Sequence, residues 1–257
     1  MVSIDLTGRV ALVIGGSRGI GEGITRVLCE AGAYTVFTWT GAPAHAARAA
    51  ALTQSIGGGM AEAAAVDARD PTATRALVER VLGARGRIDI LVCNAGKNTQ
   101  RPTEKLSDEE WGESLSLNLG SAFYAVRAVL PPMLAAGYGK IVFIGSSTVW
   151  DGGGGAIDYA AAKAGLRGMM TFLCRTYARK GILTNIVHPC VIETDLLRER
   201  YPDEEAKRKL AAQIPAGRLG QPRDIAGMVA YLASAWGDYV CGQEILLDGG
   251  RTFYRGM

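Results

Sequence analysis

The stretch Val10-Ala-Leu-Val-Ile-Gly-Gly-Ser-Arg-Gly-Ile-Gly21 places five apolar residues directly before a loop rich in glycine. The apolar, β-branched residues 10–14 predict a buried strand, and residues 20–30 follow with the pattern of a helix. Glycine permits a tight turn and a close approach of backbone to a ligand, while the N-terminus of a helix stabilises negative charge. The stretch therefore predicts a strand–loop–helix unit that binds a phosphate group, with a plain structural turn as the alternative.

Short β-branched runs alternate with longer alanine-rich stretches along the remaining sequence, which is typical of βαβ units. The predicted strands are residues 10–14, 34–38, 63–66, 88–93, 140–144, 183–187 and 244–247. The predicted helices are residues 20–30, 43–55, 71–84, 108–135, 157–179, 196–213 and 222–235. Strands that are apolar almost throughout indicate a parallel sheet covered on both faces. We expect the α/β class, with residues 1–257 forming a single-domain, Rossmann-like, doubly wound sheet of about seven strands, each followed by a helix.

Length and composition exclude several other classes. The 257 residues suit one large α/β domain, and the glycine loop after the first strand disfavours the alternative of a barrel of eight such units. The 28 basic and 25 acidic residues leave a net charge of +3, which is too small and dispersed for a nucleic-acid partner. The five cysteines include no C-x-x-C pair, so neither a disulfide framework nor a zinc site is predicted.

The sequence predicts neither a secretion signal nor a membrane segment. The N-terminal residues carry Asp5 and lack a basic leader followed by an apolar run. The longest uncharged run near the C-terminus, residues 225–237, is too short to cross a bilayer. We therefore expect a cytoplasmic protein without a membrane partner.

Further motifs extend over nearly the whole chain. They are the glycine loop with the spacing G-x-x-x-G-x-G from Gly15, Asp67 after the third predicted strand, Cys93-Asn-Ala-Gly96, Asn118, Ser146 ahead of Tyr159-x-x-x-Lys163, Pro189-Cys190 with Thr194, and Asp248-Gly-Gly250. In these motifs and their order the sequence resembles the short-chain dehydrogenase/reductase family. Residues 159–165, 192–195 and 214–220 most resemble the 3-oxoacyl-acyl-carrier-protein reductases of that family.

The resemblance implies an oxidoreductase that transfers a hydride between a nicotinamide cofactor and a ketone or secondary alcohol. It assigns proton exchange to Tyr159, and to Lys163 the ribose contact and a lowering of the Tyr159 pKa. Ser146 would orient the substrate oxygen, and Asn118 would hold a water that relays protons towards Lys163. The implied cofactor contacts are Gly15, Ser17, Arg18, Gly19, Ile20, Gly21, Thr40, Asp67, Asn94, Ala95, Gly96, Tyr159, Lys163, Pro189, Ile192 and Thr194, with no metal ligand.

The residue types themselves support this acid–base pair. Tyr159 and Lys163 are four positions apart on one predicted helix, so they share a face of it. A free phenol has a pKa of ~10 and is a poor acid at neutrality, whereas a nearby ammonium favours the phenolate. Ser147 competes with its neighbour Ser146, and the family's separation from the tyrosine favours Ser146. No G-x-S-x-G motif surrounds either serine, so hydrolysis is rejected.

The end of the second predicted strand bears on the choice of cofactor. Enzymes that use NAD commonly place a carboxylate there, and that carboxylate repels the 2′-phosphate of NADP. This chain has no acidic residue between Glu30 and Glu62. Arg18 can pair with the phosphate, and Thr40 can donate a hydroxyl to it. NADP(H) is therefore favoured and NAD(H) stays an alternative, since Arg18 could be a solvated loop residue and Trp39 could obstruct the phosphate.

Three positions depart from the family pattern. Ile14 and Cys93 are expected only to repack the strand ends. Cys190 either changes the local packing volume or presents a thiol beside the nicotinamide. The two histidines, His45 and His188, lie far apart in sequence and are expected in the core or on the surface rather than at a metal.

Several alternatives for function stay open at this point. The substrate is a small ketone or polyol or, alternatively, a 3-oxoacyl-acyl-carrier-protein in fatty-acid or polyketide synthesis; the loop 135–139 offers no basic residue to a carrier protein, although Lys180 could. A non-catalytic dinucleotide-binding scaffold or sensor is the alternative of another class, and a lyase or dehalogenase on the same fold is a third. Residues 193–215 are expected to form a substrate lid, and the charges of both signs in residues 198–209 indicate a solvated helix face or a mobile part of that lid.

A homo-oligomer, by resemblance a tetramer, is also expected. The predicted helix 157–179 carries the small residues Ala160, Ala164, Gly165 and Gly168, which allow close approach of a second helix. Packing of these residues within the core is the alternative.

Overall fold

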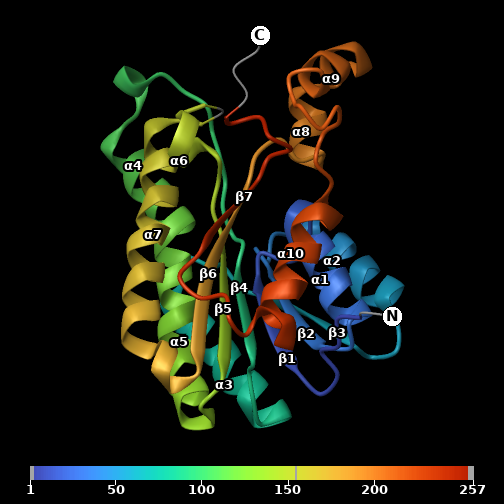
Figure 1. Cartoon of the computed structure of the whole chain (residues 1–257), viewed down its shortest axis with the longest axis vertical. Helices are drawn as coiled ribbons and strands as arrows, with labels where there is room; N and C mark the ends of the chain where they lie inside the picture. Colours follow the sequence, from blue (N-terminus) through green and yellow to red (C-terminus); the bar gives the residue numbers. More distant parts are fainter. Residues whose placement is uncertain (1–2, 154, 254–257) are drawn as a thin grey trace.

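The computed structural model describes residues 3–153 and 155–253, and its centre is a sheet of seven parallel strands (Figure 1). The strands are β1 (Val10–Ile14), β2 (Tyr34–Trp39), β3 (Ala61–Ala65), β4 (Ile90–Cys93), β5 (Gly139–Ile144), β6 (Ile182–Pro189) and β7 (Glu244–Leu247). Their order in the sheet is β3-β2-β1-β4-β5-β6-β7. The chain therefore builds one half of the sheet outward from β1, returns to β4 and builds the other half, and the predicted doubly wound sheet is confirmed.

Helices cover both faces of the sheet. They are α1 (Gly19–Glu30), α2 (Pro43–Ile56), α3 (Pro71–Arg85), α4 (Asp108–Leu115), α5 (Ser121–Ala136), α6 (Thr148–Asp151), α7 (Ile157–Tyr177), α8 (Asp195–Arg200), α9 (Glu204–Ala211) and α10 (Pro222–Ala233), with short helical turns η1 (Thr103–Lys105), η2 (Ser116–Gly120), η3 (Ala178–Lys180) and η4 (Ala235–Gly237). Figure 1 shows α3, α5 and α7 on one side of the sheet and α1, α2 and α10 on the other.

The period of two along β1 explains this two-sided cover. Leu12 and Ile14 point into the core cluster that α3, α5 and α7 complete. Ala11 and Val13 point into the opposite cluster, which α1, α2 and α10 complete. All five residues of β1 are buried, so this strand lies at the centre of both cores.

Parallel pairing brings the functional loops to one edge of the sheet. Ile14 at the end of β1 pairs with Cys93 at the end of β4, and Ile144 at the end of β5 pairs with Val187 near the end of β6. In an open α/β sheet, ligands bind outside the carboxyl ends of the strands. The loops after β1, β4, β5 and β6 all begin at this edge.

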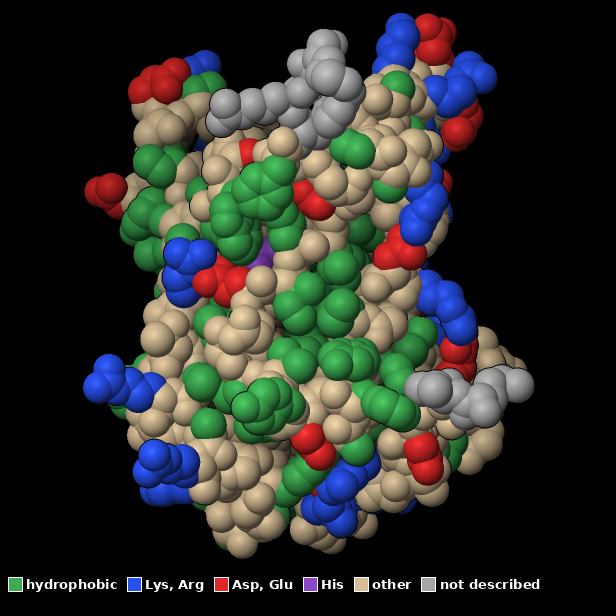
Figure 2. All heavy atoms as spheres, in the orientation of Figure 1, with side chains coloured by type: hydrophobic (Ala, Val, Ile, Leu, Met, Phe, Trp, Pro, Cys, Tyr) green, Lys and Arg blue, Asp and Glu red, His purple; other side chains and the backbone are tan. Residues whose placement is uncertain are grey.

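Two predicted helices are broken in the structure. The predicted helix 108–135 is divided into α4 and α5 by the π-helical turn η2, which contains Asn118. The predicted helix 196–213 is divided into α8 and α9 at Pro202, which has no N–H to donate, and Asp203 then caps α9 through the N–H groups of Glu205 and Ala206. Charged side chains of both signs gather on this α8–α9 lobe (Figure 2).

The last strand differs from the prediction that a helix follows every strand. Among the described residues, β7 leads into turns that extend to residue 253. The other predicted elements are present, and none of their ends differs from the prediction by more than two residues.

One stretch in the described part of the chain, Asp108–Ala136, is long and apolar enough to cross a membrane by length and composition alone. In the fold it comprises α4, η2 and α5, and Ala125, Val129 and Met133 are fully buried in the core against the sheet. A core helix of an α/β domain has this same composition.

Candidate active site

The glycine loop after β1 is held from two neighbouring strands. Gly15 donates its N–H to Oγ1 of Thr38 on β2 at 2.8 Å, and its carbonyl accepts a hydrogen bond from Nδ2 of Asn94, after β4, at 2.6 Å. Gly15 has a φ of +79°, a conformation that a side chain rarely adopts. A Cβ on Gly21 would lie 2.0 Å from the Gly15 carbonyl oxygen. Glycine is therefore required where the loop folds back on itself.

The start of α1 is suited to an anion. Arg18 occupies the N-cap position and makes no side-chain cap, so the first N–H groups of α1 are left for a ligand. Ser17 beside it is buried and Ile20 is half-buried. Thr25, in the second turn of α1, fixes the loop by sharing its hydroxyl hydrogen between the carbonyl oxygens of Gly16 and Gly21, at 3.1 and 3.0 Å. This cradle fits the pyrophosphate of a dinucleotide.

The predicted contacts to the adenosine half lie further out along the same edge. Arg18 and Thr40 are both exposed, at the end of the glycine loop and just after β2. Asp67, after β3, is engaged by Arg69 through Nη2–Oδ2 at 2.6 Å and Nε–Oδ1 at 3.0 Å, and this hydrogen bonding lowers the pKa of Asp67. The Asp67 carboxylate is therefore partly occupied by its own neighbour, a pairing that the sequence analysis did not foresee.

Lys163 is buried beneath the carboxyl edge. Its Nζ donates to the carbonyl oxygen of Ile144, the last residue of β5, at 2.8 Å and lies 5.7 Å from the centre of the Tyr159 ring. A Cβ on Gly96, after β4, would stand 3.4 Å from Nζ, so that loop passes directly beside the ammonium. Burial lowers the pKa of Lys163 to about 8.

The Tyr159 phenol differs from the expectation in one respect. Burial raises its pKa above the ordinary value, and the side-chain hydrogen bond with Ser146 opposes this without reversing it. The expected lowering of the Tyr159 pKa by Lys163 is therefore wrong for this arrangement. Removing a phenolate from water is costly, and the Lys163 ammonium is already directed at the Ile144 carbonyl.

Ser146 follows β5 and lies near Tyr159. Its Oγ accepts the N–H of Thr148 at 3.3 Å. Ser146 is half-buried, whereas the competing Ser147 is buried and donates its own N–H to the Pro189 carbonyl at 2.9 Å. The structure thus brings Ser146, Tyr159 and Lys163 together and leaves Ser147 to join β5 to β6.

Asn118 lies buried in the π-helical turn η2, and its side chain clamps the chain after β4. Oδ1 accepts the Lys97 N–H at 3.0 Å, and Nδ2 donates to the carbonyl oxygens of Lys97 at 3.0 Å and Ser114 at 3.1 Å. Both amide hydrogens are therefore used within the protein. A water relay at this position would have to use an oxygen of Asn118.

The chain after β6 closes the other side of the edge. Pro189 ends the strand, and half-buried Cys190 accepts a hydrogen bond from Nη1 of Arg251 at its Sγ, at 3.5 Å. Ile192 is buried and forms a bridge with Gly220. Thr194 packs against the glycine loop: a Cβ on Gly19 would lie 3.2 Å from Thr194 Cγ2. The departures Ile14 and Cys93 are both buried at paired strand ends.

Sequence reasoning missed a cluster of charges that joins three helices beside this loop. Arg48 of α2 donates to Oε2 of Glu22 on α1 at 2.8 Å and also pairs with Asp195, the first residue of α8. These residues line a cavity of about 350 Å³ between the glycine loop and α8. No local spacing could have revealed the cluster, because Arg48 and Asp195 are 147 positions apart.

Comparisons with known proteins agree with this geometry. A family model described as enoyl-(acyl carrier protein) reductase matches residues 14–252. The 3-oxoacyl-(acyl-carrier-protein) reductase FabG of Escherichia coli K12 is 37% identical over 247 residues, which cover 96% of this chain and 98% of that protein. The FabG protein of Pseudomonas aeruginosa PAO1 is also 37% identical over 247 residues, with the same coverage.

Solved structures give the same result. The gluconate 5-dehydrogenase of Burkholderia cenocepacia J2315, in complex with NADP and tartrate, has a TM-score of 0.89 and 34% identity, covering 98% of each chain. A short-chain dehydrogenase/reductase of Serratia marcescens BCRC 10948 has a TM-score of 0.87 and 34% identity, covering 96% of this chain and 99% of that one.

The chain therefore belongs to the short-chain dehydrogenase/reductase family. It is an NAD(P)-dependent oxidoreductase that acts on CH–OH groups or on the corresponding carbonyls.

The glycine loop gives a direct test of the cofactor site. Gly21→Ala places a methyl group 2.0 Å from the Gly15 carbonyl oxygen and 2.6 Å from Asn94 Nδ2, so the loop must shift. We expect at least a roughly tenfold loss of dinucleotide affinity and about 1–3 kcal/mol of lost stability, measured by fluorescence titration and urea unfolding. Gly83→Ala in α3, where a Cβ meets no atom within 4 Å, is the matched control. Wild-type dinucleotide affinity in Gly21→Ala would refute this role of the loop.

Proposed function

We propose that this protein is an NADPH-dependent ketoreductase that converts a ketone to a secondary alcohol. The observation that carries the proposal is the meeting of Ser146, Tyr159 and buried Lys163 at the edge where the glycine cradle opens. The NADP bound to the Burkholderia cenocepacia structure and the FabG relatives support the choice of cofactor and of direction.

The catalytic roles follow from the positions of the three side chains. When bound, NADPH supplies a hydride from C4 of its nicotinamide. Ser146 donates a hydrogen bond that orients the substrate carbonyl oxygen. Tyr159 donates the proton to that oxygen. Lys163 holds the nicotinamide ribose through Nζ, and it carries its charge below a pH of about 8.

The raised pKa of Tyr159 favours reduction over oxidation. Reduction of a ketone requires the protonated phenol, whereas oxidation of an alcohol requires the phenolate. A phenol with the ordinary pKa of ~10 is already protonated at neutral pH, and burial raises the pKa of Tyr159 further, so the donor form is the populated one. Oxidation would need a higher pH to reach comparable occupancy of the base.

Small ketones and ketone-bearing polyols are the proposed substrates, and a 3-oxoacyl-acyl-carrier-protein is the second candidate. The FabG relatives favour the second candidate. The loop between α5 and β5 carries no basic residue for an acidic carrier, although Lys180 in η3 could serve. A panel of ketones, polyols and 3-oxoacyl thioesters, followed through the absorbance of reduced nicotinamide, separates the candidates. A non-catalytic scaffold or sensor would bind NADPH and turn over none of them.

The segment α8–α9, within residues 193–215, is the proposed substrate lid. Thr194, the residue before α8, packs beside Gly19 of the glycine loop, and the pairing of Arg48 with Asp195 holds the first turn of α8 against α2. The helix α9 carries Lys207–Glu204 and Lys209–Glu205 ion pairs on its own surface. Most of the charged side chains of α9 therefore face solvent, while the first turn of α8 is held beside the glycine loop.

We further infer that the protein acts in the cytoplasm as a homotetramer without a membrane or nucleic-acid partner. The likeness to FabG and the five free cysteines support a reducing compartment. Ala160, Ala164, Gly168 and Phe172 recur every four residues along α7, and Phe172 is 63% exposed. Gly165 belongs instead to the core, because a Cβ there would lie 2.9 Å from Leu119 Cδ2.

Tyr159→Phe tests the proton donor. The variant keeps the ring and loses only the hydroxyl, so we expect the fold and NADPH binding to be retained. General acid catalysis contributes roughly 10²–10⁴-fold, so kcat should fall about a hundredfold or more. The measurement is the absorbance of reduced nicotinamide with a substrate from the panel that the wild type turns over. A variant that kept more than about half of the wild-type kcat would show that another group is the donor.

Arg18→Ala tests the cofactor preference. Arg18 is exposed at the loop and β2 ends without a carboxylate, so Arg18 is the residue available to a 2′-phosphate there. We expect KM for NADPH to rise at least roughly tenfold, about 1.4 kcal/mol, with little change in KM for NADH. Equal losses for the two cofactors, or a wild-type preference for NADH, would contradict the proposal.

Light scattering tests the oligomer. We expect a particle of four 27.1 kDa chains at micromolar concentration, and a lower mass for Phe172→Glu because that change places a charge in the stripe on α7. A wild-type monomer at this concentration would refute the assembly.

A further inference from the structure

A buried histidine lies directly behind the proposed substrate-orienting serine. His188, the seventh residue of β6, is 1% exposed. Its Nδ1 lies 3.1 Å from the backbone nitrogen of Ser146 and 3.0 Å from the backbone oxygen of the same residue. Both backbone groups of Ser146 thus face a single ring nitrogen.

The His188 ring is fixed by its neighbours. A Cβ on Gly145 would stand 2.4 Å from Nδ1, so glycine before Ser146 leaves the space that the ring occupies. Trp150 of α6 packs edge-on against the ring, with centroids 4.5 Å apart and an interplanar angle of 84°. The ring therefore has little freedom to turn away from Ser146.

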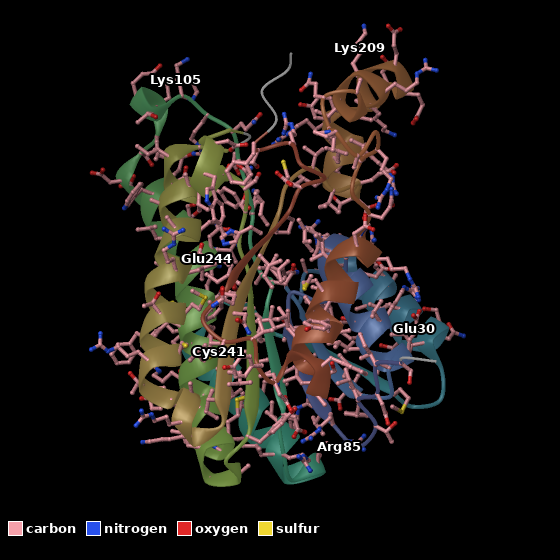
Figure 3. The ribbon with its side chains drawn as sticks, in the orientation of Figure 1. Glu30, Arg85, Lys105, Lys209, Cys241 and Glu244 are labelled. Atoms are coloured by element: carbon pink, nitrogen blue, oxygen red, sulfur yellow. The ribbon has the colours of Figure 1, made fainter. Side chains whose placement is uncertain are left out.

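The second ring nitrogen is held by a carboxylate that reaches the surface. Nε2 lies 3.1 Å from Oε2 of Glu244, the first residue of β7, and Oε1 of Glu244 pairs with Arg167 of α7. Figure 3 labels Glu244 on the side of β7 that faces α7. Arg167 is more than half exposed, so the contacts form a continuous path from solvent to Ser146.

The charges in this path decide which ring nitrogen carries the proton. A neutral imidazole has one N–H and one lone pair, and a carboxylate can only accept. Nε2 therefore carries the hydrogen and donates it to Glu244, which leaves the Nδ1 lone pair to accept the Ser146 N–H. A second proton, on Nδ1, would occupy that lone pair. Nδ1 could then no longer accept the Ser146 N–H and would instead donate to the Ser146 carbonyl oxygen.

We propose that His188, oriented by Glu244, is a positioning residue that holds Ser146 in its substrate-orienting conformation while the ring is neutral and releases the Ser146 N–H when the ring is protonated. The inference rests on the proposed role of Ser146. It adds a pH-sensitive support to the site from a buried residue that lies behind Ser146.

The charged groups around His188 set where this change occurs. Burial lowers the pKa of His188, and the Lys163 ammonium on α7 acts in the same direction. The Ser146 backbone and Glu244 on β7 raise it, while Arg167 reaches the ring only through Glu244. The net direction is downward, so the ring is neutral at pH 7 and becomes protonated only at a pH below its ordinary value of 6.5.

Two substitutions of His188 separate positioning from packing. In His188→Asn, Oδ1 can stand near the place of Nδ1 and accept the Ser146 N–H, so we expect kcat within about threefold of wild type. His188→Leu fills the space without an acceptor, and a displaced Ser146 should lower kcat roughly tenfold or more at unchanged KM for NADPH. Thermal unfolding of both variants identifies a simple folding defect. Wild-type kcat in a folded His188→Leu enzyme would overturn the proposal.

The pH profile gives a second readout. In the wild type we expect kcat to fall on the acid side of pH 6.5, as the ring takes its second proton. Glu244→Gln still accepts from Nε2 but lacks the charge that raises the His188 pKa, so the acid limb should move to lower pH. His188→Asn should lack this limb. An identical limb in His188→Asn would show that another group causes it.

The ring can also be observed without turnover. The chain has two histidines, so His45→Gln leaves His188 as the only imidazole for ¹⁵N NMR. We expect the Nε2–H tautomer at pH 7 and a midpoint below 6.5. A ring with its hydrogen on Nδ1 at pH 7 would overturn the proposal whatever the activity. If no substrate of the panel reacts but the expected tautomer is observed, the proposed reaction is contradicted, whereas the proposed hydrogen bonding of His188 is not.

Discussion

The hydrogen bond between the Asn94 amide and the Gly15 carbonyl joins the two halves of the sheet where their strand order reverses. β1 leads outward through β2 and β3, and β4 leads outward through the remaining strands, so the loops after β1 and β4 diverge at this point. The bond fixes the distance between them. The glycine loop starts at Gly15, and the Gly96 loop beside Lys163 starts at Asn94. The positions of both loops therefore depend on this hydrogen bond.

Burial governs the chemistry on the β5 side of the same edge. Burial lowers the pKa of Lys163 to about 8, and its Nζ donates to a main-chain carbonyl rather than to a carboxylate, which leaves its charge unpaired for the proposed ribose contact. The same burial raises the pKa of Tyr159. Burial thus keeps the Tyr159 phenol neutral and makes the Lys163 ammonium easier to deprotonate, and a neutral phenol is the form that the proposed carbonyl reduction needs.

The sequence predicted what local patterns control. β1 and β7 begin and end where they were expected, and the four-residue spacing of Tyr159 and Lys163 places both on α7. It could not predict the π-helical turn at Asn118, since that turn forms around a clamp on distant Lys97. The His188–Glu244 and Arg48–Asp195 pairs join residues 56 and 147 positions apart, and no periodicity carries such information. The direction of the Tyr159 pKa likewise depends on burial that only the folded chain shows.

The link from Arg48 to Asp195 has a consequence for how the lobe α8–α9 responds to its medium. Arg48 and Asp195 are 41% and 35% exposed, so dissolved ions reach both partners. At physiological ionic strength the Debye length is about 8 Å, and it contracts to about 3 Å in 1 M salt. The electrostatic hold on the lobe therefore weakens as salt is added, and the opening of the proposed lid becomes a property that ionic strength can tune independently of the buried groups beneath it.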